Sequence, residues 1–242
     1  MMKTTMIKCS VIATATLVFL LNRAAVAQVT PTMPGVTLFC SGMPMTLPTP
    51  GAGQQWMVRY SATSTETPTT TLALTDGTTI PAADLQTGYY YVSTIGDTTN
   101  PEVCESEMQE IAVYVFAPLS VSFTATDYCI EDVGSQAFTG TVTSADPYDT
   151  FSYQWYTVAD GGTGTETPIP GATNATYEPS ADIAPGTTTT YRLRAGYLVA
   201  GLRYCSADFD ATVAVTAQPG APTITIEGAA GQTPEGPTGG DE

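Results

Sequence analysis

The sequence predicts an all-β protein. Thr, Gly, Pro and Tyr are abundant, strong helix formers are absent over long stretches, and β-branched and aromatic residues favour strands. Downstream of the N-terminal segment no window has the apolar spacing of an amphipathic helix, whereas residues 111–115 and 211–215 alternate with a period of two. Short alternating runs, separated by Gly, Pro, Asn or Asp turns, are typical of two packed sheets.

The first 27 residues predict a cleaved signal peptide. Two lysines lie near the start, residues 11–21 are apolar, and an Ala-Val-Ala cleavage site ends at Ala27. The alternative is an uncleaved anchor helix, but a membrane span needs about 20 apolar residues, and Asn22 interrupts this run. We therefore expect a mature chain that starts at Gln28, is secreted or held at the cell surface, and does not insert into a membrane.

The rest of the chain contains one pattern twice. An aromatic residue and a cysteine come first, followed by Gln-Trp, a Tyr-rich run, a second cysteine and an alternating strand. The interval from Trp56 to Cys104 is 48 residues, and the interval from Trp155 to Cys205 is 50 residues. A repeated pattern of this length predicts two domains of similar fold. The expected domains cover residues 28–117 and 118–217, and a strand-plus-acidic tail covers residues 218–242.

The four cysteines of the mature chain are expected to form disulfides, as an even number in an exported protein indicates. Three pairings are possible. Because each repeat contains one pair, we expect the bonds Cys40–Cys104 and Cys129–Cys205. Each bond would close a loop of more than 60 residues, worth about 4 kcal/mol in the chain-entropy description.

Each repeat also has one tryptophan. We expect Trp56 and Trp155 to be core anchors between two sheets, because a buried indole removes about 150–250 Å² from water. The alternative is an exposed indole on which a sugar stacks, and recurrence at the same place in both repeats argues against it. In the run Tyr89-Tyr90-Tyr91, successive side chains point to opposite faces of a strand, so at least one of them is expected to be exposed.

The second repeat resembles a known family. Its segments YQWY, IPGATNATYEPS and TTTYRLRA, followed by a late cysteine and an alternating final strand, are similar to immunoglobulin-like (Ig/PKD-like) repeats of secreted and cell-surface proteins of the Bacteroidota. The resemblance covers residues 118–216 well and residues 34–117 more weakly. It implies two tandem immunoglobulin-like β-sandwich domains of the kind used in adhesins, and it carries almost no information about activity.

Composition argues against several functions. The net charge is −16 at pH 7, and the mature chain has no Lys or His, so its surface is expected to repel nucleic acid and anionic membranes. Without His, neither a Ser-His-Asp nor a Cys-His site can form. A pair of carboxylates could hydrolyse a sugar, but no insertion is long enough to form a cleft, so we expect no enzyme. Arg192 and Arg194 share one strand face and are expected to balance nearby acids.

Calcium is the one cofactor that the sequence raises. Asp127 and Asp132 lie near one cysteine of the second repeat, and Asp208 and Asp210 follow the other. If these cysteines are bonded, the carboxylates approach one another at one end of the domain, where oxygen ligands suit Ca²⁺. No calcium-loop spacing is present, and solvated acidic loops are the favoured alternative.

The tail contains the start of a further strand. Ala221-Pro222 precedes Thr-Ile-Thr-Ile, as Ala117-Pro118 precedes the first strand of the second repeat. In the first repeat the first cysteine follows Pro34 by only six positions, which predicts that this repeat lacks one edge strand. The candidate donated strand consists of Thr223, Ile224, Thr225 and Ile226.

These features predict a non-catalytic structural protein that associates with itself. A strand donated to the open edge of a neighbour would assemble subunits head to tail, and a contact of this kind that does not close produces a filament or surface layer. The alternatives are a monomeric adhesin or ligand-binding module that contacts other surface proteins, and an ordinary C-terminus with a vestigial strand.

Overall fold

The computed structural model describes residues 28–96 and 104–224, so the expected signal peptide lies outside the described residues. The chain forms two compact units that divide between Val115 and Phe116. The sequence analysis places this division two residues later, between the two expected domains. We call the part before the division unit 1 and the part after it unit 2, and describe each by itself.

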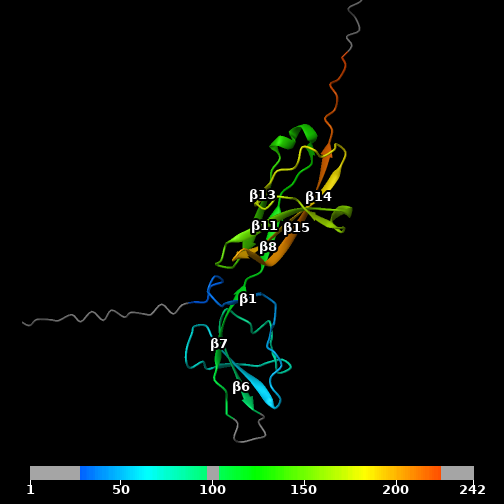
Figure 1. The fold of residues 1–242 in the computed structure, drawn as a ribbon. Helices are drawn as coiled ribbons and strands as arrows, with labels where there is room; N and C mark the ends of the chain where they lie inside the picture. Colours follow the sequence, from blue (N-terminus) through cyan, green and yellow to red (C-terminus); the bar gives the residue numbers. More distant parts are fainter. Residues whose placement is uncertain (1–27, 97–103, 225–242) are drawn as a thin grey trace, which may run out of the picture. The chain divides into compact units, whose positions relative to one another are not determined.

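Unit 2 is a sandwich of two sheets, with the strand orders β13-β10-β8 and β12-β11-β14-β15-β9 (Figure 1). The strands are Leu119–Phe123 (β8), Tyr128–Cys129 (β9), Phe138–Ser144 (β10), Phe151–Val158 (β11), Glu166–Pro168 (β12), Thr176–Tyr177 (β13), Thr188–Val199 (β14) and Leu202–Thr216 (β15). Two short 3-10 helices, Ile130–Ser135 (η1) and Asp160–Gly162 (η2), are the helical structure among the residues that the structure describes.

Alternating side chains from both sheets of unit 2 form one core. Val213 and Val215 of β15 are buried, whereas Thr212 is exposed, as a period of two requires. From the other sheet, the ring of Phe123 lies 4.8 Å from that of Trp155, centroid to centroid. Both sheets therefore contribute to the same apolar cluster, which makes the unit a β-sandwich.

The strand order of unit 2 is that of an immunoglobulin-like domain. In such a domain strands A, B and E share one sheet, and strands C, F and G share the other. The order β8-β10-β13 gives A, B and E, and β11-β14-β15 gives C, F and G. The short strand β9 runs parallel to β15, pairing Tyr128 with Val215. A strand D, which would follow E in the first sheet, is absent from the described residues of this unit.

Unit 1 has the sheets β1-β7-β6-β3-β4 and β2-β5. The strands are Thr37–Cys40 (β1), Met45–Thr46 (β2), Gln54–Ser61 (β3), Thr70–Leu72 (β4), Thr79–Ile80 (β5), Gly88–Gly96 (β6) and Gln109–Phe116 (β7). The five-stranded sheet matches that of unit 2 strand for strand, with β1 in the place of β9 and β7 in the place of β15. Strand β8 has no counterpart among the described residues of unit 1.

The two tryptophans occupy equivalent strands but different environments. Trp155 on β11 has no exposed surface, and its indole N–H donates to the Asn174 carbonyl oxygen at 2.9 Å. Trp56 on β3 is only half-buried, packs beside the core of unit 1, and donates to the Pro48 carbonyl oxygen at 2.7 Å. The second sheet of unit 1 has only two strands. It therefore covers the indole of Trp56 less completely than the three-stranded sheet of unit 2 covers the indole of Trp155.

The expectation of an exposed tyrosine in the run Tyr89-Tyr90-Tyr91 is wrong. The three side chains are between 0% and 4% exposed. Tyr90 faces the core cluster of unit 1, and the neighbours on the other face are covered as well. The hydroxyl oxygen of Tyr91 accepts a hydrogen bond from the backbone N–H of Thr65 at 2.7 Å, so the segment after β3 packs over the outer face of β6.

The expected disulfides Cys40–Cys104 and Cys129–Cys205 are not present. Cys40 and Cys205 are in disulfide form, whereas Cys104 and Cys129 are free thiols. Cys104 is exposed and directly precedes Glu105, which bridges to Ile95 on β6.

The geometry of β15 explains why the second expected pair does not form. Cys129 pairs with Thr216 at the end of β15, and Cys205 lies near its start. Eleven residues of strand span about 36 Å, and a disulfide requires Cα atoms within about 7 Å. Cys205 also lies in a bulge opposite Gly196, with a positive φ of 53°. The two cysteines therefore resemble a repeat-internal pair in the sequence but cannot bond, because Cys129 lies beside the far end of the strand that contains Cys205.

Candidate functional site

Two arginines and three carboxylates form one ion-pair network on the outer face of the larger sheet of unit 2. Arg192 on β14 donates to Asp210 on β15 through Nε and Nη2, both at 2.7 Å. Arg194 binds Asp208 in the same two-point manner, also at 2.7 Å. Glu166 on β12 joins the pairs, accepting from Arg192 at 3.1 Å and from Arg194 at 3.0 Å. The network ties three strands together across the sheet.

The network leaves neither arginine available to a ligand. Hydrogen bonds from Arg194, followed by those from Arg192, hold the pKa of Glu166 below its ordinary value. The guanidinium of Arg194 also lies over the Tyr156 ring, 5.0 Å from its centroid, a distance at which the cation and ring attract each other. The expectation that this arginine pair balances nearby acids is confirmed. The arrangement fits cross-strand bracing rather than capture of an anion.

The four calcium candidates are not brought together. The carboxylates of Asp208 and Asp210 are engaged by arginines. Asp127 accepts a hydrogen bond from the backbone N–H of Ala214 at 2.7 Å, toward the other end of β15, and Asp132 lies in η1. The expected convergence depended on a disulfide that is not formed. Over residues 28–96 and 104–224, no group of three or more Cys, Asp or Glu residues has the geometry to hold a metal ion.

Unit 1 has a smaller ion pair. Arg59 on β3 binds Glu105 through both terminal nitrogens, with Nη2 2.8 Å from Oε2. The hydroxyl of Ser93, which is 1% exposed, donates to the same carboxylate. These donors, Arg59 first, lower the pKa of Glu105 to about 2. The carboxylate that Ser93 and Arg59 share thus fixes the segment that precedes β7 against β3 and β6.

The expected open edge of unit 1 lies along β2. Met45 pairs with Ile80, and the N–H of Leu47 donates to the Thr78 carbonyl at 2.8 Å. Since backbone groups alternate in direction along a strand, Thr46 presents its N–H and carbonyl to the opposite edge. No strand pairs with that edge within the described part of unit 1.

Unit 2 has an open edge along β13. Tyr177 pairs with Phe138 of β10, and the Ala175 carbonyl accepts the Gly140 N–H at 2.8 Å. Thr176, between Ala175 and Tyr177, therefore turns its N–H and carbonyl away from β10. This is the edge at which a strand D would lie.

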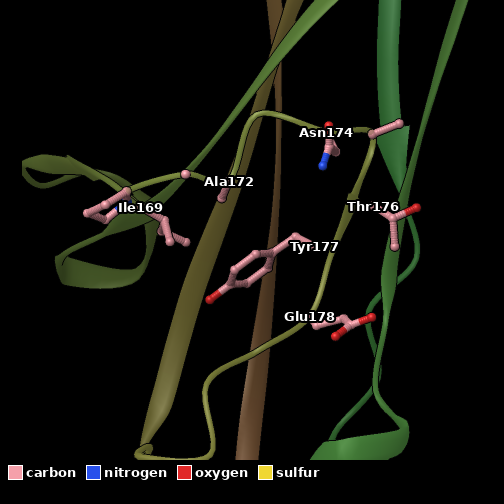
Figure 2. Close-up of a pocket in the computed structure, with 9 residues that line it drawn as sticks. Ile169, Ala172, Asn174, Thr176, Tyr177 and Glu178 are labelled. Carbon is pink, nitrogen blue, oxygen red and sulfur yellow. The ribbon is translucent and has the colours of Figure 1, made fainter.

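An open depression of about 670 Å³ lies beside the β13 edge. Figure 2 shows two limbs of chain around it, with Ile169 and Ala172 on one limb and Thr176 and Glu178 on the other. The Tyr177 ring lies between the limbs. It packs against Trp155, with 5.6 Å between the ring centroids. The depression thus combines an unpaired backbone edge with an apolar floor.

The tail is only partly described. Thr223 and Ile224 have no strand partner, and Ile224 is 80% exposed. Thr225 and Ile226, the rest of the candidate donated strand, lie outside the described residues. An isoleucine this exposed leaves most of its apolar surface in water, which is the condition that pairing with another strand would relieve.

Sequence reasoning missed two parts of the site. Glu166 joins the two arginine pairs from β12. In the sequence this residue lies in a Gly/Thr/Pro-rich stretch, and no spacing pattern links it to β14. The depression beside β13 was missed because it follows from the absence of a strand D. The short interval of seven residues between β12 and β13 is the sequence signal that could have indicated it.

No helix among the described residues is long and apolar enough to cross a membrane.

Comparison with known proteins gives distant likenesses only. No protein-family model matches the chain, and no curated protein matches it. Among solved structures, the amphioxus IgVJ-C2 molecule is 14% identical, with a TM-score of 0.32, over 74% of this chain and 99% of that one. The fibronectin(III)-like modules of Clostridium thermocellum CbhA are 12% identical, with a TM-score of 0.36, over 79% of this chain and 93% of that one.

A third solved structure, the N-terminal four Ig domains of Dscam1 isoform 4.44, is 16% identical, with a TM-score of 0.29, over 77% of this chain and 45% of that one. TM-scores of this size support no conclusion about function. The assignment of the fold rests on the strand order and the shared cores described above.

Proposed function

We propose that this chain is an exported, non-catalytic structural protein, and that copies of it assemble head to tail into an extracellular filament or surface layer. The observation that carries the proposal is the exposed tail: Ile224 is 80% exposed in an alternating Thr-Ile-Thr-Ile segment, in a chain whose two small sheets have unpaired edges. The segment has the β-branched composition of a strand, and an added strand gains backbone hydrogen bonds at a bare edge.

The export part of the proposal has separate support. Cys40 and Cys205 are in disulfide form, and disulfides persist mainly in oxidising compartments outside the cytosol. The basic, apolar and small-residue regions of residues 1–27 suit a signal peptide. The resemblance of unit 2 to Ig/PKD-like repeats of Bacteroidota surface proteins agrees with the same location.

The geometry of donor and acceptor determines the form of the assembly. The donor is at the C-terminal end of unit 2, and the acceptor edge lies elsewhere on the chain. Such a contact is heterologous, because two different surfaces meet, and it continues from subunit to subunit unless a ring closes.

Deletion of the tail tests this function. The mature chain, residues 28–242, is expected to form polymers visible by negative-stain electron microscopy and to leave a size-exclusion column ahead of a monomer. A chain that ends at Ala221 is expected to remain monomeric.

Two tail variants sharpen this test. Replacing Ile224 and Ile226 together by Asp removes the apolar face of the donor and should abolish polymers, whereas the matched control Glu227→Gln should preserve them. A strictly monomeric mature chain, or polymers that persist without the tail, would contradict the proposal. A monomer that binds a glycan or another surface protein would instead support the adhesin alternative.

A further inference from the structure

We propose that the acceptor of the donated strand is the β13 edge of unit 2, and that the Thr223–Ile226 segment of a second copy occupies it as the missing strand D. This inference rests on the proposed function and names the acceptor within it. The first sheet of unit 2 ends at β13, where an immunoglobulin-like sheet with strands A, B, E and D has one strand more.

The backbone of β13 is free to pair. Thr176 presents an unbonded N–H and carbonyl to the edge away from β10, as the Ala175–Gly140 hydrogen bond on the other side requires. Glu178, two positions after Thr176, is not a proline, so its backbone N–H can extend the same edge. The Asn174 carbonyl is already bonded to the indole of Trp155, which fixes this segment in place before a strand arrives.

The β2 edge of unit 1 is a poorer acceptor. Pro44 and Pro48 lie two positions to either side of Thr46 and therefore face the same edge, and proline has no N–H to donate. Prolines placed in this way are a recognised means of protecting an edge strand.

The side chains of the tail suit the depression beside β13. In an added strand, Ile224 and Ile226 share one face and the threonines share the other. The isoleucines would lie over the floor formed by Tyr177 and against Ile169 and Ala172, and the threonines would face water.

The donor is a second copy because the chain's own tail does not take this place. Residues 217–224 are described and form no strand, and they are exposed throughout. The tail follows Thr216, which pairs with β9 at one edge of the larger sheet, whereas β13 is an edge strand of the other sheet.

Two proline variants, one in each unit, test this assignment. Thr176→Pro and the matched control Thr46→Pro each remove one outward N–H without removing a ladder hydrogen bond. The probe is a fluorescein-labelled peptide of residues 221–228, and the receptor is the chain that ends at Ala221. We expect Thr176→Pro to weaken peptide binding at least tenfold in fluorescence anisotropy, and Thr46→Pro to leave it within twofold.

Amide hydrogen exchange supplies a readout that needs no variant. In the receptor without substitutions, the peptide should slow exchange of the Thr176 and Glu178 amides and not that of Thr46. Protection of the Thr46 amide, or of the amides of neither edge, would overturn the assignment to β13. This exchange measurement tests the assignment even if Thr176→Pro does not fold.

The mature chain separates the two proposals. Tail-dependent polymers that form normally with Thr176→Pro would overturn the β13 assignment and leave the proposed function standing. The mature chain could instead stay monomeric with the amides of its own tail protected from exchange, while the peptide binds β13 of the chain that ends at Ala221. That result would overturn the second copy as donor, because the tail would then bind within its own chain. Neither polymers nor peptide binding would overturn both.

Discussion

At the scale of single residues, the core of unit 2 is organised around Trp155. Its indole has no exposed surface, meets Phe123 edge to face, and donates its one polar hydrogen to the Asn174 carbonyl. Buried indoles usually find such a partner, since an unmade hydrogen bond in a core is costly. The same bond holds the segment leading to β13, so the core anchor also positions the proposed acceptor edge.

Tyr128 is the exception to this rule. Its hydroxyl oxygen is buried with no hydrogen-bond partner among the described residues, and burial raises its pKa. Replacing an unsatisfied hydroxyl by hydrogen removes the cost of its desolvation, so Tyr128→Phe should stabilise unit 2 by about 1 kcal/mol. Urea unfolding followed by Trp155 fluorescence measures this change.

Tyr197→Phe is the matched control for this prediction. The hydroxyl of Tyr197 donates to the Ala117 carbonyl at 2.9 Å and also contacts Ser144, so its loss should destabilise the unit by about 1 kcal/mol or more. Equal destabilisation by Tyr128→Phe would mean that the Tyr128 hydroxyl has a partner and that the prediction is wrong.

Acid should weaken unit 1 through Glu105. Its pKa falls from an ordinary 4.5 to about 2 beside Arg59, so the ionised form stabilises the folded state. This contribution is complete above the unfolded-state pKa, and is lost as pH falls from about 4.5 to about 2. Glu105→Gln should cost about 1 kcal/mol or less at pH 7 and flatten the acid dependence.

Hydrogen exchange of β6, measured by mass spectrometry between pH 5 and pH 2.5 with correction for the intrinsic rate, reports this effect. Glu107→Gln, an exposed neighbour, is the control and should retain the acid dependence of the natural chain. If Glu105→Gln and the natural chain lose protection in parallel, another carboxylate is responsible.

At the scale of elements, β14 and β15 are the longest strands of unit 2, and their pairing positions both its ion-pair network and part of its core. Its register places Arg192 opposite Asp210 and Arg194 opposite Asp208, and alternation turns Leu193 into the core between them. The bulge at Gly196 interrupts the register, and Cys205 lies in it between two paired stretches of the ladder. In this strand pair the ion pairs lie on the outer face, the core residues lie on the inner face, and the disulfide-bonded cysteine lies in the bulge.

Cysteine chemistry follows these positions. Alkylation of the folded, non-reduced protein with iodoacetamide should label Cys104 rapidly and Cys129 more slowly, because Cys104 is exposed and Cys129 is half-buried. Cys40 and Cys205, which are in disulfide form, should react only after reduction. Peptide mass spectrometry identifies the labelled sites. A crosslinked peptide that contains Cys104 or Cys129 would contradict the structure.

At the scale of the whole molecule, two units repeat one strand order and differ at one strand. Strand β8 fills the edge of the first sheet in unit 2, and unit 1 has none in this place among its described residues. Strands β2 and β13 both have an unpaired edge among the described residues, but Pro44 and Pro48 flank the one on β2. Of these two edges, the one on β13 is therefore the better acceptor for the exposed segment that begins at Thr223.

Assembly of such subunits should depend on salt. The 242-residue chain carries a net charge of −16 at pH 7, and the mature copy is more negative because residues 1–27 contain basic and no acidic residues, so neighbours repel one another at low ionic strength. Raising NaCl from 0.1 M to 1 M shortens the Debye length from about 10 Å to about 3 Å and should increase the polymer fraction several-fold in sedimentation assays. Polymers that dissolve as salt rises would show that ion pairs, rather than strand addition, hold the subunits together.

The sequence by itself determined the all-β class and the doubled pattern, because these follow from composition and from periodicity along the chain. It also indicated the short first sheet of unit 1, through the few residues between Pro34 and Cys40. Tertiary structure alone decided the bonding of the cysteines and the partners of Asp208 and Asp210. Each of these depends on where two distant segments meet, and residue spacing does not contain that distance. The open edge at β13 was also decided by the tertiary structure alone, because a strand edge is open only when no other segment of the chain pairs with it.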